Sequence, residues 1–152
     1  METGNAMIDA QTAFARARRR RRRARVLGWL LRRSGADRQL PLLHDELRGR
    51  PPGARRHAGL ASIPLCSIVG TAESAKARTF DRSFLPSGAI RLRWERLWIA
   101  GRRGAALPPI SVYRLDDRHF VDDGHHRVSV ARALGMSAID AEVTEISRAA
   151  EL

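Results

Sequence analysis

The chain has 152 residues, a formal net charge of +12 and a hydrophobic fraction of 43%. This length suits one domain with a tail, or two very small units. A lone cysteine, Cys66, excludes an intramolecular disulfide, and the longest apolar run near the N-terminus, Val26–Leu31, is too short to cross a membrane. We expect a cytoplasmic protein.

The positive charge is concentrated in the N-terminal part of the chain. Residues 1–60 contain 15 arginines and 5 acidic residues, whereas residues 61–152 contain 13 basic and 11 acidic residues. A basic segment can attract polyanions such as nucleic acid or anionic lipid. The alternative is an arginine-rich coding bias without a binding role, since Lys76 is the only lysine.

A helix is predicted over residues 9–33, which are rich in Ala, Arg and Leu and are followed by Ser34-Gly35. Because six consecutive arginines point in every direction around a helix, we expect its middle to project into solvent or onto a partner. Residues 1–35 are therefore interpreted as an Arg-rich helical arm, partly disordered over residues 1–8. The candidate nucleic-acid contacts are Arg18, Arg19, Arg20, Arg21, Arg22 and Arg23. A protein partner, a membrane surface and a solvated helix without a role remain alternatives.

Residues 36–59 are predicted to hold a short helix, Leu40–Leu47, and a linker, Gly49–Gly59, which contains Pro51-Pro52-Gly53. A domain is expected over residues 60–147, followed by a tail at 148–152. An edge strand is expected at Ser62–Ile68.

The remaining elements of this domain are defined by apolar spacing. Trp94 and Trp98 lie on one face of a helix expected within Gly88–Gly101, and this spacing favours core packing over base stacking. The other predicted elements are strands at Pro109–Tyr113 and His119–Val121, a helix at His126–Leu134 and a strand at Ala138–Thr144. Together they predict an α+β fold.

Asp123-Gly124-His125-His126-Arg127 lies where a predicted strand gives way to a helix. A helix start presents free backbone N–H groups, Gly124 lets an anion approach, and Arg127 offers a bidentate donor. These features are typical of a phosphate site, with the histidines as further donors. Alternatively, Asp123 caps the helix and the histidines lie on the surface.

The segment Pro108–Val143, PPISVYRLDDRHFVDDGHHRVSVARALGMSAIDAEV, resembles the core of the ParB/sulfiredoxin-like superfamily. The resemblance implies a small mixed sheet with packed helices. In that family a Gly-x-x-Arg element contacts nucleotide phosphates, which implies nucleotide binding by Gly124, His125, His126 and Arg127. The nucleotide could carry Mg²⁺, and no separate metal site is expected.

The sequence departs from the family at the same motif. Sulfiredoxins have a nucleophilic Cys where this chain has His125, so their reductase chemistry is not expected. ParB proteins have Gly-Glu-Arg-Arg for CTP, and His125 and His126 replace its middle residues. We also expect no helix-turn-helix domain.

The resulting hypothesis is a nucleotide-binding regulatory module with non-specific nucleic-acid affinity. One alternative is a small phosphotransferase or nuclease, with Asp123, His125 and His126 as candidate catalytic residues. Another is a non-catalytic scaffold with a vestigial site. Whether the chain forms a homodimer stays open.

Overall fold

In the computed structural model, which describes residues 4–150, a five-stranded mixed sheet has the strand order β1-β5-β3-β4-β2. β1 pairs with β5 and β3 with β4 in antiparallel fashion, whereas β3–β5 and β2–β4 are parallel. The α+β class is confirmed. The strands are β1 (Arg55–Pro64), β2 (Ile68–Thr71), β3 (Ile110–Leu115), β4 (Arg118–Asp123) and β5 (Ala138–Ile146).

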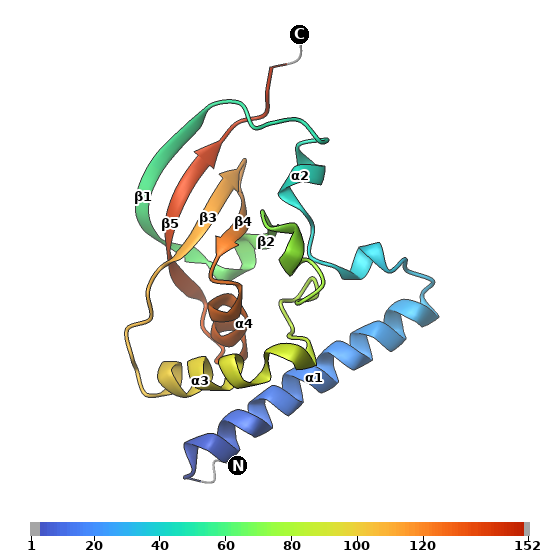
Figure 1. The fold of residues 1–152 in the computed structure, drawn as a ribbon, viewed down its shortest axis with the longest axis vertical. Helices are drawn as coiled ribbons and strands as arrows, with labels where there is room; N and C mark the ends of the chain where they lie inside the picture. Colours follow the sequence, from blue (N-terminus) through green and yellow to red (C-terminus); the bar gives the residue numbers. More distant parts are fainter. Residues whose placement is uncertain (1–3, 151–152) are drawn as a thin grey trace.

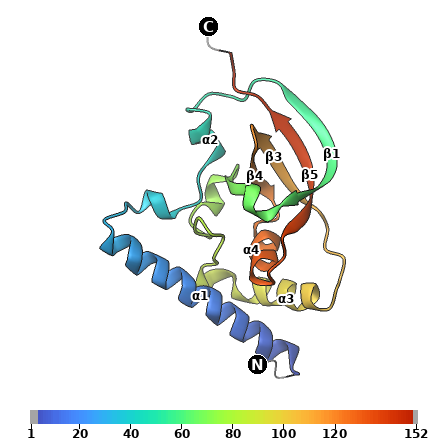
Figure 2. The same cartoon turned by 180° about the vertical axis from the view of Figure 1, so that it is seen from behind.

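Helices cover one end of this sheet. Both views show α3 between α4, which lies next to the sheet, and α1, which crosses outside (Figure 1, Figure 2). The predicted helices near residues 88–101 and 126–134 are confirmed with small shifts in their bounds. The α-helices are α1 (Ala6–Leu30), α2 (Leu43–Glu46), α3 (Arg91–Arg102) and α4 (His125–Ala133). Short 3-10 turns are η1 (Ala36–Arg38), η2 (Leu65–Ser67), η3 (Ser74–Lys76) and η4 (Gly88–Ile90).

The main core lies between the sheet and α4, where Val112, Val121 and Val128 are buried. A second cluster joins α3 to α1, and both Trp94 and Trp98 are buried in it. The prediction that these two tryptophans are core residues is therefore confirmed.

The middle of the arginine-rich helix is exposed at Arg19, Arg20, Arg22 and Arg23, as expected, whereas the N-terminal half of α1 is docked on the domain. Ala10, Phe14 and Ala17 are buried, and the Phe14 ring meets the Trp94 ring edge-on with centroids 5.5 Å apart. These three residues repeat at i, i+4 and i+7, so they form an apolar strip that docks on α3. Residues 6–8 also belong to α1, with Asn5 as its N-cap, so they are not disordered; residues 1–3 lie outside the described part. The large apolar side chains of α1 that stay exposed lie at its two ends. Met7 and Ile8 are at the N-terminal end, and the C-terminal end has Val26, Leu27, Trp29 and Leu30.

The linker expected at Gly49–Gly59 is wrong from Arg55 onward, because β1 begins there and pairs with β5. Most side chains of β1 are exposed, so the strand has no apolar alternation to reveal it. The strand expected at Ser62–Ile68 is likewise divided, since β1 ends at Pro64 and β2 begins at Ile68.

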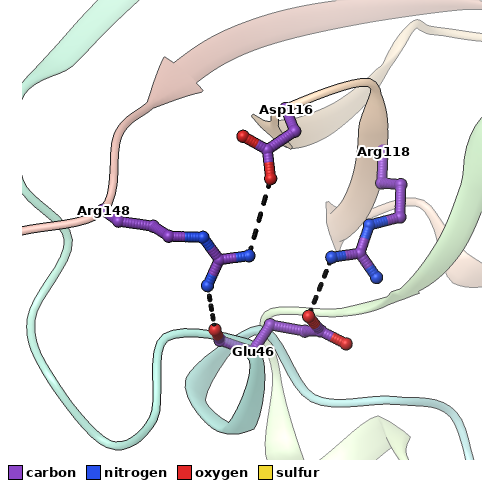
Figure 3. A network of polar contacts seen from close by, with 4 residues as sticks. All are labelled: Glu46, Asp116, Arg118 and Arg148. Carbon is purple, nitrogen blue, oxygen red and sulfur yellow. Dashed lines mark hydrogen bonds and ion pairs between the residues drawn. The ribbon is translucent and has the colours of Figure 1, made fainter.

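Four charged residues join α2, the β3–β4 hairpin and the chain after β5 (Figure 3). Arg118 donates to the Glu46 carboxylate at 2.8 Å, which lowers the pKa of Glu46. Arg148 pairs with Asp116 at 3.5 Å and donates to the Glu46 carbonyl. Among residues 4–150, no helix is both long and apolar enough to cross a membrane.

Candidate functional site

The first candidate site is the junction between β4 and α4. Because β2 and β4 are parallel, their carboxyl ends meet at one edge of the sheet. This brings Thr71, at the end of β2, beside His125, the first residue of α4. Thr71 and His125 are 54 positions apart in the chain, so no local sequence pattern predicts this contact.

Gly124 is the N-cap of α4 and has φ +107°, a backbone conformation that other residues rarely adopt. A Cβ added at Gly124 would lie 2.4 Å from Cγ2 of Ile110. The glycine therefore lets the chain turn sharply while passing close to β3, as its place in the motif predicts.

Both histidines of the motif lie inside the fold. His125 is 2% exposed and shares a 2.7 Å hydrogen bond between its Nε2 and Oγ1 of Thr71. His126 is 7% exposed and meets the ring of Phe80 edge-on. Burial lowers the pKa of each to about 4, with Lys76 adding to the effect at His125. Both imidazoles are thus neutral at pH 7, and they hold the start of α4 in place.

Arg127 is engaged with the protein itself. Its Nη2 lies 2.7 Å from Oδ2 of Asp123, and its Nη1 donates to the carbonyls of Pro108 and Pro109. Asp123 forms this ion pair and does not cap α4, since no side chain caps that helix. The structure therefore brings Asp123, Gly124 and Arg127 together, and turns the histidines away toward Thr71 and Phe80.

Carboxylates surround the same junction. Burial raises the pKa of Asp122, and the negative charges of Glu73 and Asp123 raise it further. Within the described part of the chain, no group of three or more His, Cys, Asp or Glu residues is placed to hold a metal ion. Magnesium bound together with phosphate stays an expectation.

The second candidate site is the arginine run of α1, which divides into two sets. Arg18 donates to the carbonyl of Pro86, and Arg21 donates to the carbonyls of Thr79, Arg78 and Leu85. The other arginines of the run are exposed and, with exposed Arg16, make up what we call the arginine face: Arg16, Arg19, Arg20, Arg22 and Arg23.

The arginine face is not neutralised by nearby acids. Residues 10–36 contain ten arginines and no Asp or Glu. Within residues 4–150, none of the five side chains forms an ion pair. These guanidinium groups are therefore free to contact an external anion.

No family model and no curated protein matches this chain. Among solved structures, it is similar to sulfiredoxin from Arabidopsis thaliana, with 19% identity and a TM-score of 0.44. That similarity covers 58% of this chain and 86% of the sulfiredoxin chain. Functional assignment therefore depends on the residues of this chain.

Proposed function

We propose that this protein binds nucleic acid through backbone phosphates, without reading base sequence, and that the arginine face of α1 is the contact surface. The observation that carries the proposal is five exposed arginines without ion pairs, among the described residues, on a helix that is fixed to the domain. Guanidinium groups pair with phosphate in a bidentate manner.

The geometry of α1 suits this role because the helix is anchored on its opposite side. Phe14 packs on Trp94, and Arg18 and Arg21 donate to backbone carbonyls of residues 78–86. At a rise of 1.5 Å per residue, Arg16–Arg23 span about 10 Å. Duplex DNA presents about six phosphate charges over that length. A rigid helix also loses little conformational freedom on binding.

The test is the salt dependence of binding to fluorescent duplex DNA of two unrelated sequences. Five phosphate contacts predict a slope of log K against log salt of about −4.5, equal for both sequences. Replacing three arginines, Arg19→Ala/Arg22→Ala/Arg23→Ala, should make the slope shallower by about 2.7.

The matched control removes the same charge elsewhere, as Arg50→Ala/Arg96→Ala/Arg103→Ala. These arginines are exposed and form no ion pair within residues 4–150. Substitution is preferable to deleting the helix, because deletion would uncover Trp94. Equal loss in both triple variants, or binding that salt does not weaken, would contradict the proposal.

A nucleotide at Gly124–Arg127 is the second candidate, and the observation that favours it is the Gly124 backbone. The left-handed Gly124 turn leads directly into the helix start at His125, whose free backbone N–H groups suit a phosphate. A phosphate would have to replace the Asp123 carboxylate on Arg127. Such a nucleotide could then regulate the nucleic-acid contact.

The enzyme alternative at this junction rests on Asp123, which is 74% exposed and can reach a substrate. His125 and His126 are buried, so a phosphotransferase or nuclease step that uses them would require the junction to open. If neither nucleotide nor nucleic acid binds, the non-catalytic scaffold is the remaining hypothesis.

A further inference from the structure

A cavity of about 410 Å³ lies between α1, residues 33–39 and residues 78–83. Residues 78–83 are far in the sequence from the other two segments, so only folding adds their charges to those of α1 and residues 33–39. In Figure 1 the chain leaves α1 and turns back toward α2. Among the described residues, its lining includes two aspartates and six arginines: Arg21, Arg25, Arg33, Arg38, Arg78 and Arg82. We call it the arginine cavity.

The two aspartates of the cavity accept hydrogen bonds from neighbouring residues of their own turns. Oδ2 of Asp37 accepts hydrogen bonds from the backbone N and Oγ of Ser34. Oδ1 of Asp81 accepts from the backbone N of Ser83 and of Leu85, both at 2.9 Å. Neither forms an ion pair within residues 4–150, so a formal excess of four positive charges remains around one small space.

Two of the six arginines, Arg21 and Arg38, are fixed by contacts with the protein and form part of the cavity wall. Arg21 donates to three carbonyls of residues 78–85, and its pKa is lowered, first by burial and also by the charges of Arg18 and Arg25. The aliphatic stem of Arg38 packs against Gly28, where an added Cβ would lie 3.3 Å from the Arg38 Cδ.

The other four arginines are free to turn toward a ligand. Within residues 4–150, no hydrogen bond or ion pair engages the side chains of this set, which comprises Arg25, Arg33, Arg78 and Arg82. Four guanidinium groups from three segments can surround a compact anion with several oxygens, which relieves their mutual repulsion.

We propose that the arginine cavity binds a compact polyphosphate, either free or as the di- or triphosphate group of a nucleotide. The small side chain of Ala24 leaves room along α1. The Phe80 side chain in the lining is fully buried, so it offers no face on which a base could stack. Recognition would therefore depend on the phosphates. This site shares no residue with the arginine face, so either can fail alone.

Calorimetry of the full chain at about 0.15 M salt, the physiological ionic strength, with tripolyphosphate, ATP and AMP tests the proposal. Tripolyphosphate and ATP should bind with similar affinity, and AMP at least about tenfold more weakly, because it loses charge-assisted hydrogen bonds. Arg33→Ala/Arg82→Ala should weaken tripolyphosphate binding by about a hundredfold, at roughly tenfold for each arginine.

The matched control, Arg50→Ala/Arg103→Ala, removes the same charge from exposed positions outside the cavity and should leave tripolyphosphate affinity unchanged. Arg78→Lys provides a second variant that keeps the charge and loses the bidentate donor, so it should weaken binding by several-fold. Equal effects in the two double variants, AMP as tight as ATP, ATP far tighter than tripolyphosphate, or no tripolyphosphate binding would each overturn the proposal.

Discussion

Asp123 and Arg127 form an ion pair across the first turn of α4, with Oδ2 of Asp123 2.7 Å from Nη2 of Arg127. The Arg127 side chain is 15% exposed and the Asp123 side chain 74% exposed. The carboxylate thus covers a guanidinium that the carbonyls of Pro108 and Pro109 already hold in place. A phosphate approaching the start of α4 would compete with Asp123 for the same donor.

This competition predicts opposite effects for the two partners. Asp123→Asn should tighten nucleotide binding by up to about fivefold, because an exposed ion pair is worth at most about 1 kcal/mol. Arg127→Ala should weaken binding by roughly 1.5–3 kcal/mol. Calorimetry with ATP and CTP, with and without Mg²⁺, measures both in chains that also carry Arg33→Ala/Arg82→Ala, so that the arginine cavity does not contribute. Asp117→Asn, at an exposed turn, is the control. Unchanged affinity in Arg127→Ala would place the nucleotide elsewhere.

Gly124→Ala should destabilise the fold much more than Gly135→Ala. Both glycines have positive φ, so each substitution costs about 1 kcal/mol of backbone strain. Only at Gly124 does the new Cβ also collide with Ile110, which adds roughly 1–3 kcal/mol of overpacking. At Gly135 no atom lies within 4 Å. Urea unfolding of both variants measures the difference, and equal midpoints would show that Ile110 moves aside without cost.

The sequence predicts the fold best where side chains alternate between a core and solvent. β3 and β5 show such alternation, and Gly135 follows the helix between them, so these elements were predictable. β1 was not predictable, because only one of its ten residues, Ile63, is buried. Its conformation is imposed by backbone pairing with β5, which no local pattern reveals.

The candidate site was predictable in place but not in orientation. The Gly124 turn follows from local sequence, whereas the burial of His125 depends on Thr71 and Phe80. In α1, helical spacing from Phe14 places Arg18 and Arg21 on the docked face, yet an arginine gives no sign that it will donate to a loop carbonyl. Such directions come from tertiary packing.

The buried histidines predict a loss of stability on mild acidification. The pKa of His125 and of His126 is lowered to about 4, mainly by burial, from the ordinary 6.5 expected in the unfolded chain. Between pH 4 and pH 6.5 the unfolded state binds more protons than the folded state. The free energy of unfolding is therefore highest above pH 6.5 and decreases as the pH falls toward 4. We expect a loss of at least about 2 kcal/mol.

Urea unfolding at about pH 7.5 and about pH 5 checks this, since both lie on either side of the unfolded-state pKa. His126→Leu should reduce the difference between the two conditions, because one titrating group is removed. The control His57→Leu, at an exposed position of β1, should leave it unchanged. An identical pH dependence in His126→Leu and the native chain would contradict the assignment.

Phe14→Ala tests whether α1 is an integral part of the fold. The Phe14 side chain is 6% exposed and packs edge-on against Trp94, so its removal should cost roughly 3–5 kcal/mol. Leu27→Ala, on the same helix but 56% exposed, should change stability by less than about 0.5 kcal/mol. Urea unfolding, monitored by circular dichroism, compares the stability of the two variants. If α1 were an independent arm, it would unfold separately, and Phe14→Ala would leave the stability of the domain unaltered. That result would also mean that the arginine face is not held by a rigid support.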